Sequence, residues 1–562
     1  MKLRKTAALG LLTIGSAYTA FADEKSENLN KFNDFDVRLL EATDARDAQN
    51  PVFGEAIKSG KWAALTYLGQ IGGEACARIT PFLTHENAEA REAAALGVAA
   101  CNDASLGQAL VDAEEEDNSV SRLIAMGFSG GDMGRQYLVE TVNAIEAGTG
   151  VGHCAVMEPR EVALFALMQA IVYDRLDPSA LPDLDVAHLL ELTADPCVGY
   201  KAAYLLGRLQ KLDQILSLEE VTHAVDTAPA PDVSRALVRV LRQFGNASSL
   251  TLQALAGGEN NEIAMEAVRA MGSLSDEGSK NYLIALVAGE DTFMRHLALA
   301  ALAGRDAMDA GVSQLIAASV EDPNPWVAVT ALQSLNVRTP EEVLPVARRW
   351  FEGDDYYKAF SAMSLLSQSD EGKAILEAYA GANPNTIRGR EAAIALDPSI
   401  EGIEKPRKTP GWNMVRSYQE RELKLQTTRG DVCIKPSSLA PYAAANFMLL
   451  ADVGKMNGML WHRVIPNFVA QAGQSEDPEL ASWGTIREEW WGSIHVPGTV
   501  GVATAGRDTG STQFFINTAY NMHLNGRYTV MGHVTEGMDV AHKLQEGDVI
   551  EKAETVRAGM CK

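Results

Sequence analysis

Side chains that could do chemistry gather in three segments near the C-terminal end of the chain. Residues 461–473 read Trp-His-Arg-Val-Ile-Pro-Asn-Phe-Val-Ala-Gln-Ala-Gly, and residues 501–520 and 523–538 follow. They combine an arginine with amides and aromatic rings. The GxSxG, HExxH, P-loop and GxGxxG patterns do not occur in a usable context, so we expect neither a metal ion nor a cofactor.

In order and spacing, these segments resemble the three signature stretches of the cyclophilin family of peptidyl-prolyl cis/trans isomerases. The likeness begins at a hairpin expected around residues 422–436, passes through a helix starting at residues 441–447, and ends near Val556. The resemblance implies a closed β-barrel with capping helices and isomerase activity on proline-containing protein or peptide clients.

The chemistry of prolyl rotation explains these residue types. Resonance holds the bond planar, and uncatalysed rotation takes roughly tens to hundreds of seconds. A fixed cation beside the imide nitrogen draws its lone pair out of resonance, because a pyramidal nitrogen accepts a hydrogen bond and a planar one does not. The resemblance assigns this role to Arg463, and it adds Phe468 and Gln471 to the catalytic set. It places the substrate-binding positions at His462, Val469, Ala503, Thr504, Ala505, Gln513, Phe515, His523, Leu524 and Tyr528.

Several of these residues have an alternative structural interpretation. Phe468 and Phe515 could be ordinary barrel core, and His462 is a candidate for scaffold as much as for chemistry. His523 stands where many cyclophilins have a tryptophan that lines the pocket, which predicts weak binding of cyclosporin. Thr504 takes the position whose main chain pairs with the peptide, between two small alanines.

The region before these segments is helical and repetitive. From about residue 30 to 400, alanine and leucine recur at three- and four-residue spacings. Polar turn residues return with a period of about 30, which is typical of an α-solenoid; they are Asp195, Asp232, Asn261, Asp291, Asp322 and Asp354. These units resemble short HEAT-like repeats.

We therefore expect a multidomain chain: a signal peptide at 1–22, a HEAT-like α-solenoid at 23–400, a linker at 401–420 and the isomerase domain at 421–562. The first segment has a basic start, an apolar stretch and Ala20-Phe21-Ala22 before Asp23, which predicts export, to a bacterial periplasm. We expect no membrane span after its removal; an uncleaved anchor is the alternative.

The chain has a formal net charge of −25, and its acidity lies mostly in the front part. Such a surface repels phosphate backbones, so we expect no nucleic-acid partner. Solubility explains the charge, and a preference for basic partners is the alternative.

The six cysteines of an exported chain favour disulfides, although six allow 15 pairings. Nearest-neighbour pairing within each domain predicts Cys76–Cys101, Cys154–Cys197 and Cys433–Cys561. Free, buried cysteines are the alternative.

Two functions fit the whole chain. In the first, an exported isomerase assists protein folding, and the helical repeats bind a protein partner whose identity the sequence does not give. In the second, the chain is an adaptor whose cyclophilin fold merely holds a proline loop. The retained Arg463, Phe468, Gln471 and Phe515 favour the enzyme.

Overall fold

The computed structural model describes residues 34–113, 120–146, 159–171, 181, 183–305, 309–397, 399, 410–477, 479–480, 483–489 and 494–561. The expected signal peptide, Cys154 and residues 401–409 of the expected linker lie outside these ranges. Within them, no helix is long and apolar enough to cross a membrane.

The N-terminal region is built of paired helices that pack on their neighbours. Inner helices α11, α13, α15, α17, α19 and α21 follow one another side by side. The helices of the region are α2 (Asp34–Asp44), α3 (Pro51–Lys58), α4 (Ala63–Ile71), α5 (Ala88–Cys101), α6 (Gly107–Asp112), α7 (Val120–Ser129), α8 (Gly131–Asn143), α9 (Pro159–Ile171), α10 (Val186–Glu191), α11 (Gly199–Leu206), α12 (Leu218–Asp226), α13 (Pro231–Leu241), α14 (Ser249–Ala256), α15 (Asn261–Met271), α16 (Glu277–Val287), α17 (Thr292–Ala303), α18 (Ala310–Ser319), α19 (Pro325–Arg338), α20 (Val343–Phe351), α21 (Tyr356–Leu366), α22 (Asp370–Ala382) and α23 (Ile387–Leu396).

The predicted polar turns lie at the starts of inner helices, although of the six predicted residues only Asp291 is itself an N-cap. The Asp291 side chain accepts hydrogen bonds from the main-chain N–H groups of Phe293 and Met294, and Asn260 and Asn324 cap α15 and α19 in the same way. These caps satisfy N–H groups that have no partner within the helix. In α15, α17, α19 and α21 the N-cap is thus the predicted turn residue or lies within two residues of it, whereas α11 and α13 have no side-chain cap.

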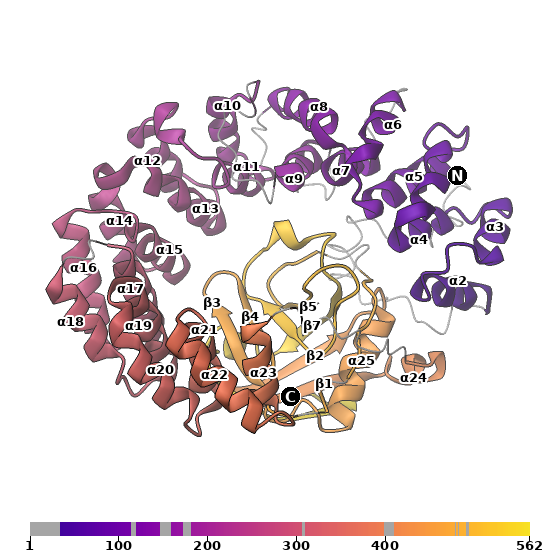
Figure 1. Cartoon of the computed structure of the whole chain (residues 1–562). Coiled ribbons are helices and arrows are strands. Elements are labelled where there is room, and N and C mark those ends of the chain that lie inside the picture. Colours follow the sequence, from indigo (N-terminus) through magenta and orange to yellow (C-terminus); the bar gives the residue numbers. More distant parts are fainter. Residues whose placement is uncertain are drawn as a thin grey trace.

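Figure 1 shows these helices as an arc with the C-terminal sheet domain lying inside it. The sheet domain has α24 (Trp412–Ser417), α25 (Pro441–Asp452), α26 (Met538–Ala541) and strands β1 (Arg421–Thr427), β2 (Gly430–Pro436), β3 (Leu460–Ile465), β4 (Val469–Gln474), β5 (Thr499–Val502), β6 (Phe514–Asn517), β7 (Val530–Glu536) and β8 (Ile550–Arg557). Within the expected linker, α24 and Tyr418 follow residue 410, and Val415 and Tyr418 pack into the core of this domain.

All eight strands belong to one curled antiparallel sheet in the order β3-β4-β6-β5-β7-β2-β1-β8. The expected hairpin is β1–β2, and Gly430 at its turn has φ of 129°, a region open to glycine. The core between the sheet and α25 includes Phe447, Trp461 and Phe514, each at most 1% exposed.

The expectation of a closed barrel is wrong. The edge strands β3 and β8 meet only over a short stretch, where an isolated bridge joins Leu460 to Val549 and main-chain hydrogen bonds link residues 458–461 to residues 547–550. Further along β3, the main-chain N–H of Val464 donates to a carboxylate oxygen of Glu546 at 3.0 Å. Because a side chain satisfies this edge group, the ladder between the two strands does not continue.

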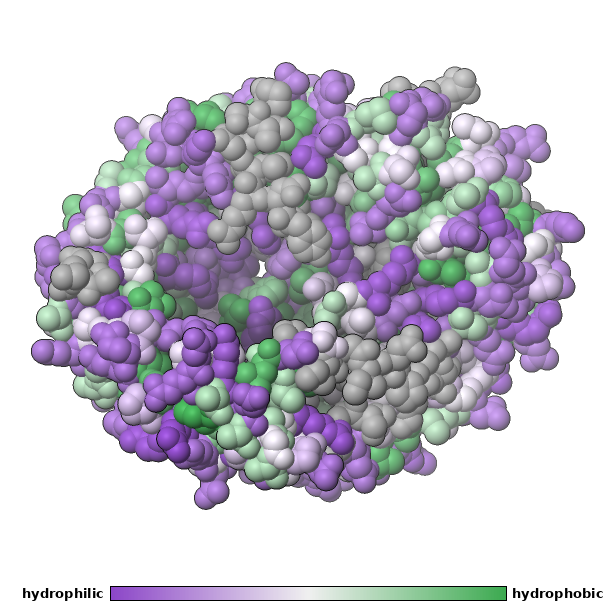
Figure 2. Space-filling view, in the orientation of Figure 1, coloured by the Kyte–Doolittle hydropathy of each residue, from purple (hydrophilic) through white to green (hydrophobic). Residues whose placement is uncertain are grey.

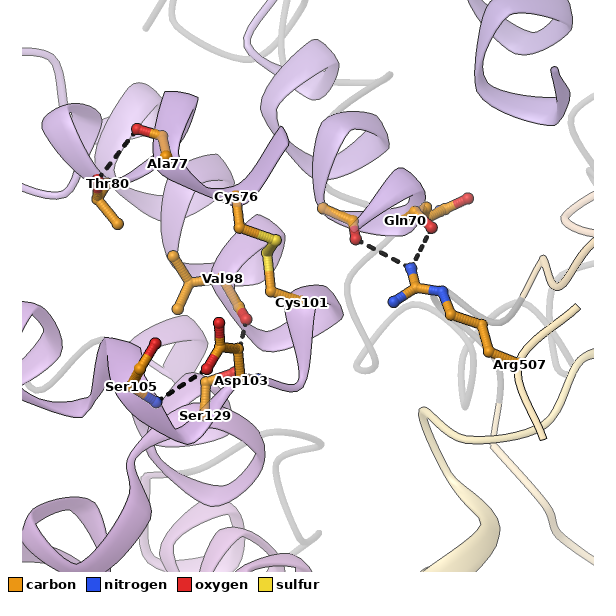
Figure 3. Close-up of a disulfide and its surroundings, with 11 residues drawn as sticks. Gln70, Cys76, Ala77, Thr80, Val98, Cys101, Asp103, Ser105, Ser129 and Arg507 are labelled. Carbon is orange, nitrogen blue, oxygen red and sulfur yellow. Dashed lines mark hydrogen bonds between the residues drawn. A yellow bond between two sulfur atoms is a disulfide. The ribbon is translucent and has the colours of Figure 1, made fainter. Parts of the chain in front are cut away.

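Disulfides join Cys76 to Cys101 and Cys433 to Cys561. The first links the segment after α4 to the end of α5 (Figure 3). Cys197 is also disulfide-bonded, and its expected partner Cys154 lies outside the described residues. The described cysteines include no free thiol.

The arc contacts the sheet domain along its length. Near its start, the Arg507 guanidinium donates to the carbonyls of Gly69 and Gln70 (Figure 3). In the middle, Trp326 of α19 is buried and joins the core cluster of the sheet domain. Near its end, Arg388 of α23 pairs with Glu476 at 2.9 Å. The concave side of the arc is thus occupied by the chain's own sheet domain.

Candidate active site

Three adjacent strands bring the first two signature segments together. Arg463 on β3 lies opposite Gln471 on β4, and Gln471 lies opposite Phe515 on β6. The β3–β4 turn at Pro466 and Asn467 sets this register, and Asn467 adopts the left-handed conformation (φ 60°) that asparagine tolerates. Phe515, which follows Gln471 by 44 residues and Arg463 by 52, thus lies only one strand away from Gln471 and two strands away from Arg463.

The apolar side chains expected to hold proline form one cluster. Val469, Phe515 and Leu524 are buried at its base, and Phe468, Ala503 and Tyr528 pack against them while remaining partly exposed. Gly501 on the neighbouring strand makes room for the Phe515 ring, because a Cβ there would lie 2.2 Å from Cζ of that ring. The cluster is therefore a pocket with a buried floor and an open mouth.

Arg463 stands at this mouth. Its side chain is exposed, one guanidinium nitrogen donates to Oε1 of Gln471 at 3.3 Å, and its Cζ lies 5.6 Å from the centre of the Phe468 ring. The amide nitrogen of Gln471 donates in turn to Oε1 of Gln513 at 3.1 Å. This chain of amides orients Gln471 and holds the cation beside the pocket.

His462 and the loop after β5 complete the predicted positions. His462 is partly buried, and burial lowers its pKa to about 4, so the imidazole is neutral at pH 7. The N–H of Ala503 is bonded to the carbonyl of Gln513, whereas Ala505 is exposed. Thr504 and Tyr528 border a cavity of about 250 Å³ that Phe128 of α7 lines from the other side.

His523 contacts both regions of the chain. It lies on the 3-10 helix η12 (Met522–Leu524), and its ring stacks on Phe468 with centroids 5.3 Å apart. On its other side, the hydroxyl of Tyr204 from α11 lies 2.6 Å from Nδ1, and the two rings are stacked. Burial holds the pKa of His523 well below its usual range, and the nearby charges of Arg208, Arg239 and Arg527 lower it further.

Sequence reasoning missed two of these neighbours. Tyr204 carries no signal, because a tyrosine in a helical repeat is ordinarily core. His495 precedes β5, is fully buried and stacks on Phe515 at 5.6 Å. Its two ring nitrogens lie 3.1 Å from Asn517 Nδ2 and 3.1 Å from the Tyr528 carbonyl, which fixes a neutral ring with the proton on Nε2. Burial lowers the pKa of His495 to about 4.

Comparison with known proteins agrees with this geometry. Residues 423–560 match the family model described as cyclophilin type peptidyl-prolyl cis-trans isomerase/CLD, and residues 218–303 match HEAT repeats. The chain is 42% identical over 116 residues to peptidyl-prolyl cis-trans isomerase B of Bacillus subtilis, covering 81% of that protein and 20% of this chain.

Two further relatives cover the same small share of this chain. A peptidyl-prolyl cis-trans isomerase of Helicobacter pylori is 36% identical over 151 residues, with 93% of that protein and 24% of this chain covered. One from Synechococcus elongatus is 35% identical over 130 residues, with coverage of 90% and 22%. Both resemblances seen in the sequence are confirmed, and the chain belongs to the cyclophilin-type peptidyl-prolyl cis-trans isomerase family.

Proposed function

We propose that this protein is an exported prolyl isomerase that acts on proline-containing segments of other exported proteins. The observation that carries the proposal is the placement of Arg463. Its guanidinium is held by Gln471 and Phe468 at the mouth of an apolar pocket. In the part of the chain that the structure describes, no acidic side chain forms an ion pair with it.

The pocket and Arg463 have different roles in catalysis: the pocket holds the proline ring, and Arg463 stabilises the twisted imide bond. The proline ring enters between Phe468, Phe515 and Leu524, where burial of apolar surface holds it. Arg463 then donates a hydrogen bond to the imide nitrogen as that nitrogen becomes pyramidal. This interaction is stronger in the twisted state than in either planar state, so it lowers the barrier in both directions.

The chain on either side of proline needs polar partners. Gln471 and the main chain around Thr504 border the pocket and are the groups we assign to substrate carbonyls and amides. The neutral state of His462 leaves Arg463 as the cation of the site. No proton leaves the substrate in this scheme, and none of these residues acts as a nucleophile.

The helical repeats supply the second part of the proposal. Tyr204 of α11 contacts His523 beside the pocket, and Phe128 of α7 lines the cavity next to Thr504 and Tyr528. Figure 2 shows the molecule hollowed between the arc and the sheet domain. We assign the repeats to substrate selection, together with binding of a protein partner still to be identified.

Export to a bacterial periplasm is supported by the basic and apolar start of the sequence and by the disulfides, which persist in oxidising compartments. The N-terminus of the mature protein tests it: mass spectrometry of the native product is expected to find Asp23 as the first residue. A chain that still begins at Met1 contradicts the proposal.

The activity itself is tested with a peptide containing Ala-Pro, followed by exchange NMR so that no coupling protease is needed. Arg463→Ala is expected to lower kcat/KM by about 100-fold, the usual effect of removing one transition-state donor. Arg557→Ala is the matched control, since Arg557 is exposed and lies at the end of β8 away from the bridge between Val549 and β3. Absence of acceleration by the wild-type protein would refute the proposal.

A further inference from the structure

Arginines from both regions surround the pocket, although the protein as a whole is strongly acidic. Arg208 follows α11, Arg463 lies on β3, and Arg507 lies in the loop after β5. Each of them is bonded to neutral groups: the Tyr204 hydroxyl, the Gln471 amide, and the Gly69 and Gln70 carbonyls respectively. Among the described residues, none of the three forms an ion pair, so no carboxylate in direct contact neutralises their charges.

Arg208 is placed at the pocket by two consecutive hydrogen bonds. Its Nη2 donates to the Tyr204 hydroxyl at 2.6 Å, and that hydroxyl lies 2.6 Å from Nδ1 of His523. Since His523 stacks on Phe468, the guanidinium lies behind the wall that contacts the proline ring. A cation from the helical repeats thus belongs to the immediate surroundings of the site.

A second cationic group lies beside the β3–β4 turn. Glu266 of α15 is 5% exposed at its side chain and receives both Arg239 at 2.9 Å and Arg269 at 2.6 Å. Arg269 also donates to the carbonyl of Pro466 at 3.1 Å. Because one carboxylate serves two guanidiniums, this group carries an excess positive charge next to the site.

The acidic residues on the opposite side do not cancel this charge. Glu476 pairs with Arg388 at 2.9 Å, and Asp477 pairs with Lys455 at 2.8 Å. Burial raises the pKa of Glu391 to about 7, and the carboxyl accepts a hydrogen bond from Tyr356. These acids are thus paired or only partly ionised. Arg463 acts on Glu546, whose pKa burial raises, and Asp508 and Glu488 act on Arg507, but none of these acids lies at ion-pair distance from either arginine.

We propose that the site between the arc and the sheet domain selects proline segments that carry an acidic side chain within two residues of the proline. This inference rests on the proposed isomerase function and names the substrate class of that same site. A carboxylate there meets the exposed Arg463 and Arg507 and lies near the partly buried Arg208. At separations of several ångströms and an intermediate dielectric, one such charge is worth about fivefold in kcat/KM.

The substrate set contains six peptides, each with one proline. In three of them a Glu, Gln or Lys lies two residues after the proline, and in the other three it lies two residues before the proline. Exchange NMR on the full-length protein at low ionic strength gives kcat/KM for each. We expect the Glu peptide to exceed the Gln peptide by about fivefold on at least one side of the proline, and the Lys peptide to be poorer than Gln. The preference should largely disappear in roughly 0.5 M salt.

Two substitutions assign the preference to the repeats. Arg208→Gln is expected to lower the Glu-to-Gln ratio to about 2, whereas Arg208→Lys keeps the charge and most of the ratio. Arg557→Gln removes one charge far from the site and should leave the ratio unchanged. Thermal unfolding of each variant shows whether the fold is intact, and the lysine variant decides the matter if the glutamine variant is unstable.

The outcomes separate this inference from the one it rests on. Equal acceleration of all the peptides overturns the acidic preference and leaves the isomerase proposal standing. A preference for Glu that survives salt, or that Arg208→Gln does not reduce, also overturns it. If none of the peptides is accelerated, both proposals fall together.

Discussion

The helical repeats and the sheet domain hold their interiors together in opposite ways. In the repeats, a helix packs on the helices just before and after it, and the disulfide Cys76–Cys101 spans a sequence separation of 25. In the sheet domain, β1 pairs with β8 at the far end of the domain, and Cys433–Cys561 spans a separation of 128.

This difference decides how damage spreads. The stability of a repeat array is close to a sum of units and nearest-neighbour terms, so a weakened helix affects its neighbours first. A sheet whose first and last strands pair must form or unfold as one unit. The floor of the candidate site lies in the sheet and one wall lies in the repeats. Its integrity therefore depends on both the cooperative sheet and the locally stabilised helices.

The largest contrast is expected from the disulfides. Removing Cys433–Cys561 by a double Cys→Ser change should lower the free energy of unfolding by about 5 kcal/mol, against about 3.5 kcal/mol for Cys76–Cys101, because the longer loop gains more entropy in the unfolded chain. Urea unfolding gives both values when a sheet-domain signal is followed for Cys433–Cys561 and a helical signal for Cys76–Cys101. An equal or reversed order would show that the sheet domain does not depend on this long-range link.

Two buried phenylalanines compare the cores directly. Phe514 in β6 and Phe351 in α20 are both fully buried, so each change to alanine should cost about 3–5 kcal/mol. With Phe514→Ala, we expect hydrogen exchange to rise across the whole sheet domain and activity to fall. With Phe351→Ala, exchange should rise mainly over α19–α23. Loss of protection throughout the molecule in both variants would contradict the comparison.

We expect low pH to destabilise the sheet domain through His495, which lies beside the pocket. Burial lowers the pKa of His495 to about 4, below its unfolded value, so the folded state binds fewer protons between these values. The neutral His495 ring therefore contributes roughly 3 kcal/mol to the free energy of unfolding. This contribution is complete above about pH 6.5 and is lost as the pH falls toward 4.

His495→Gln should therefore reduce the slope of unfolding free energy against pH in this window. His542→Gln, at an exposed histidine, should leave the slope as it is. An unchanged slope in the His495 variant would show that this imidazole is already accessible to protons in the folded protein.

The smallest effect tests the wall supplied by the repeats. Tyr204→Phe keeps the ring stacked on His523 but removes the hydroxyl at Nδ1, and should lower kcat/KM by about 2- to 10-fold, the worth of one hydrogen bond. The ¹⁵N shift of His523 Nδ1 should change with it. Tyr200→Phe on the same helix loses a bond to the Tyr520 carbonyl instead and is expected to leave that shift unchanged. The same response in both variants would mean that Tyr204 acts only through general packing.

The sequence by itself determined the parts that depend on local order. The resemblance of the motif around Arg463 and Gln471 to the cyclophilin family already named the side chains expected at the pocket, and the period of two within β4 places Val469 and Gln471 on one face. The repeated polar turns likewise specified the helices, because N-caps act over three residues. Both the strand motif and the helix starts depend on residues close together in the sequence, and both are present in the structure.

Only the tertiary structure decided how the two regions meet. The contact between Tyr204 and His523 joins residues 319 positions apart, and no periodicity links a repeat to one loop of another domain. The opening of the sheet between β3 and β8 also depended on a distant side chain, Glu546, that takes the place of a strand partner. Long-range packing and desolvation determine such contacts, and the surroundings of Arg463 therefore emerged only when the arc and the sheet were seen together.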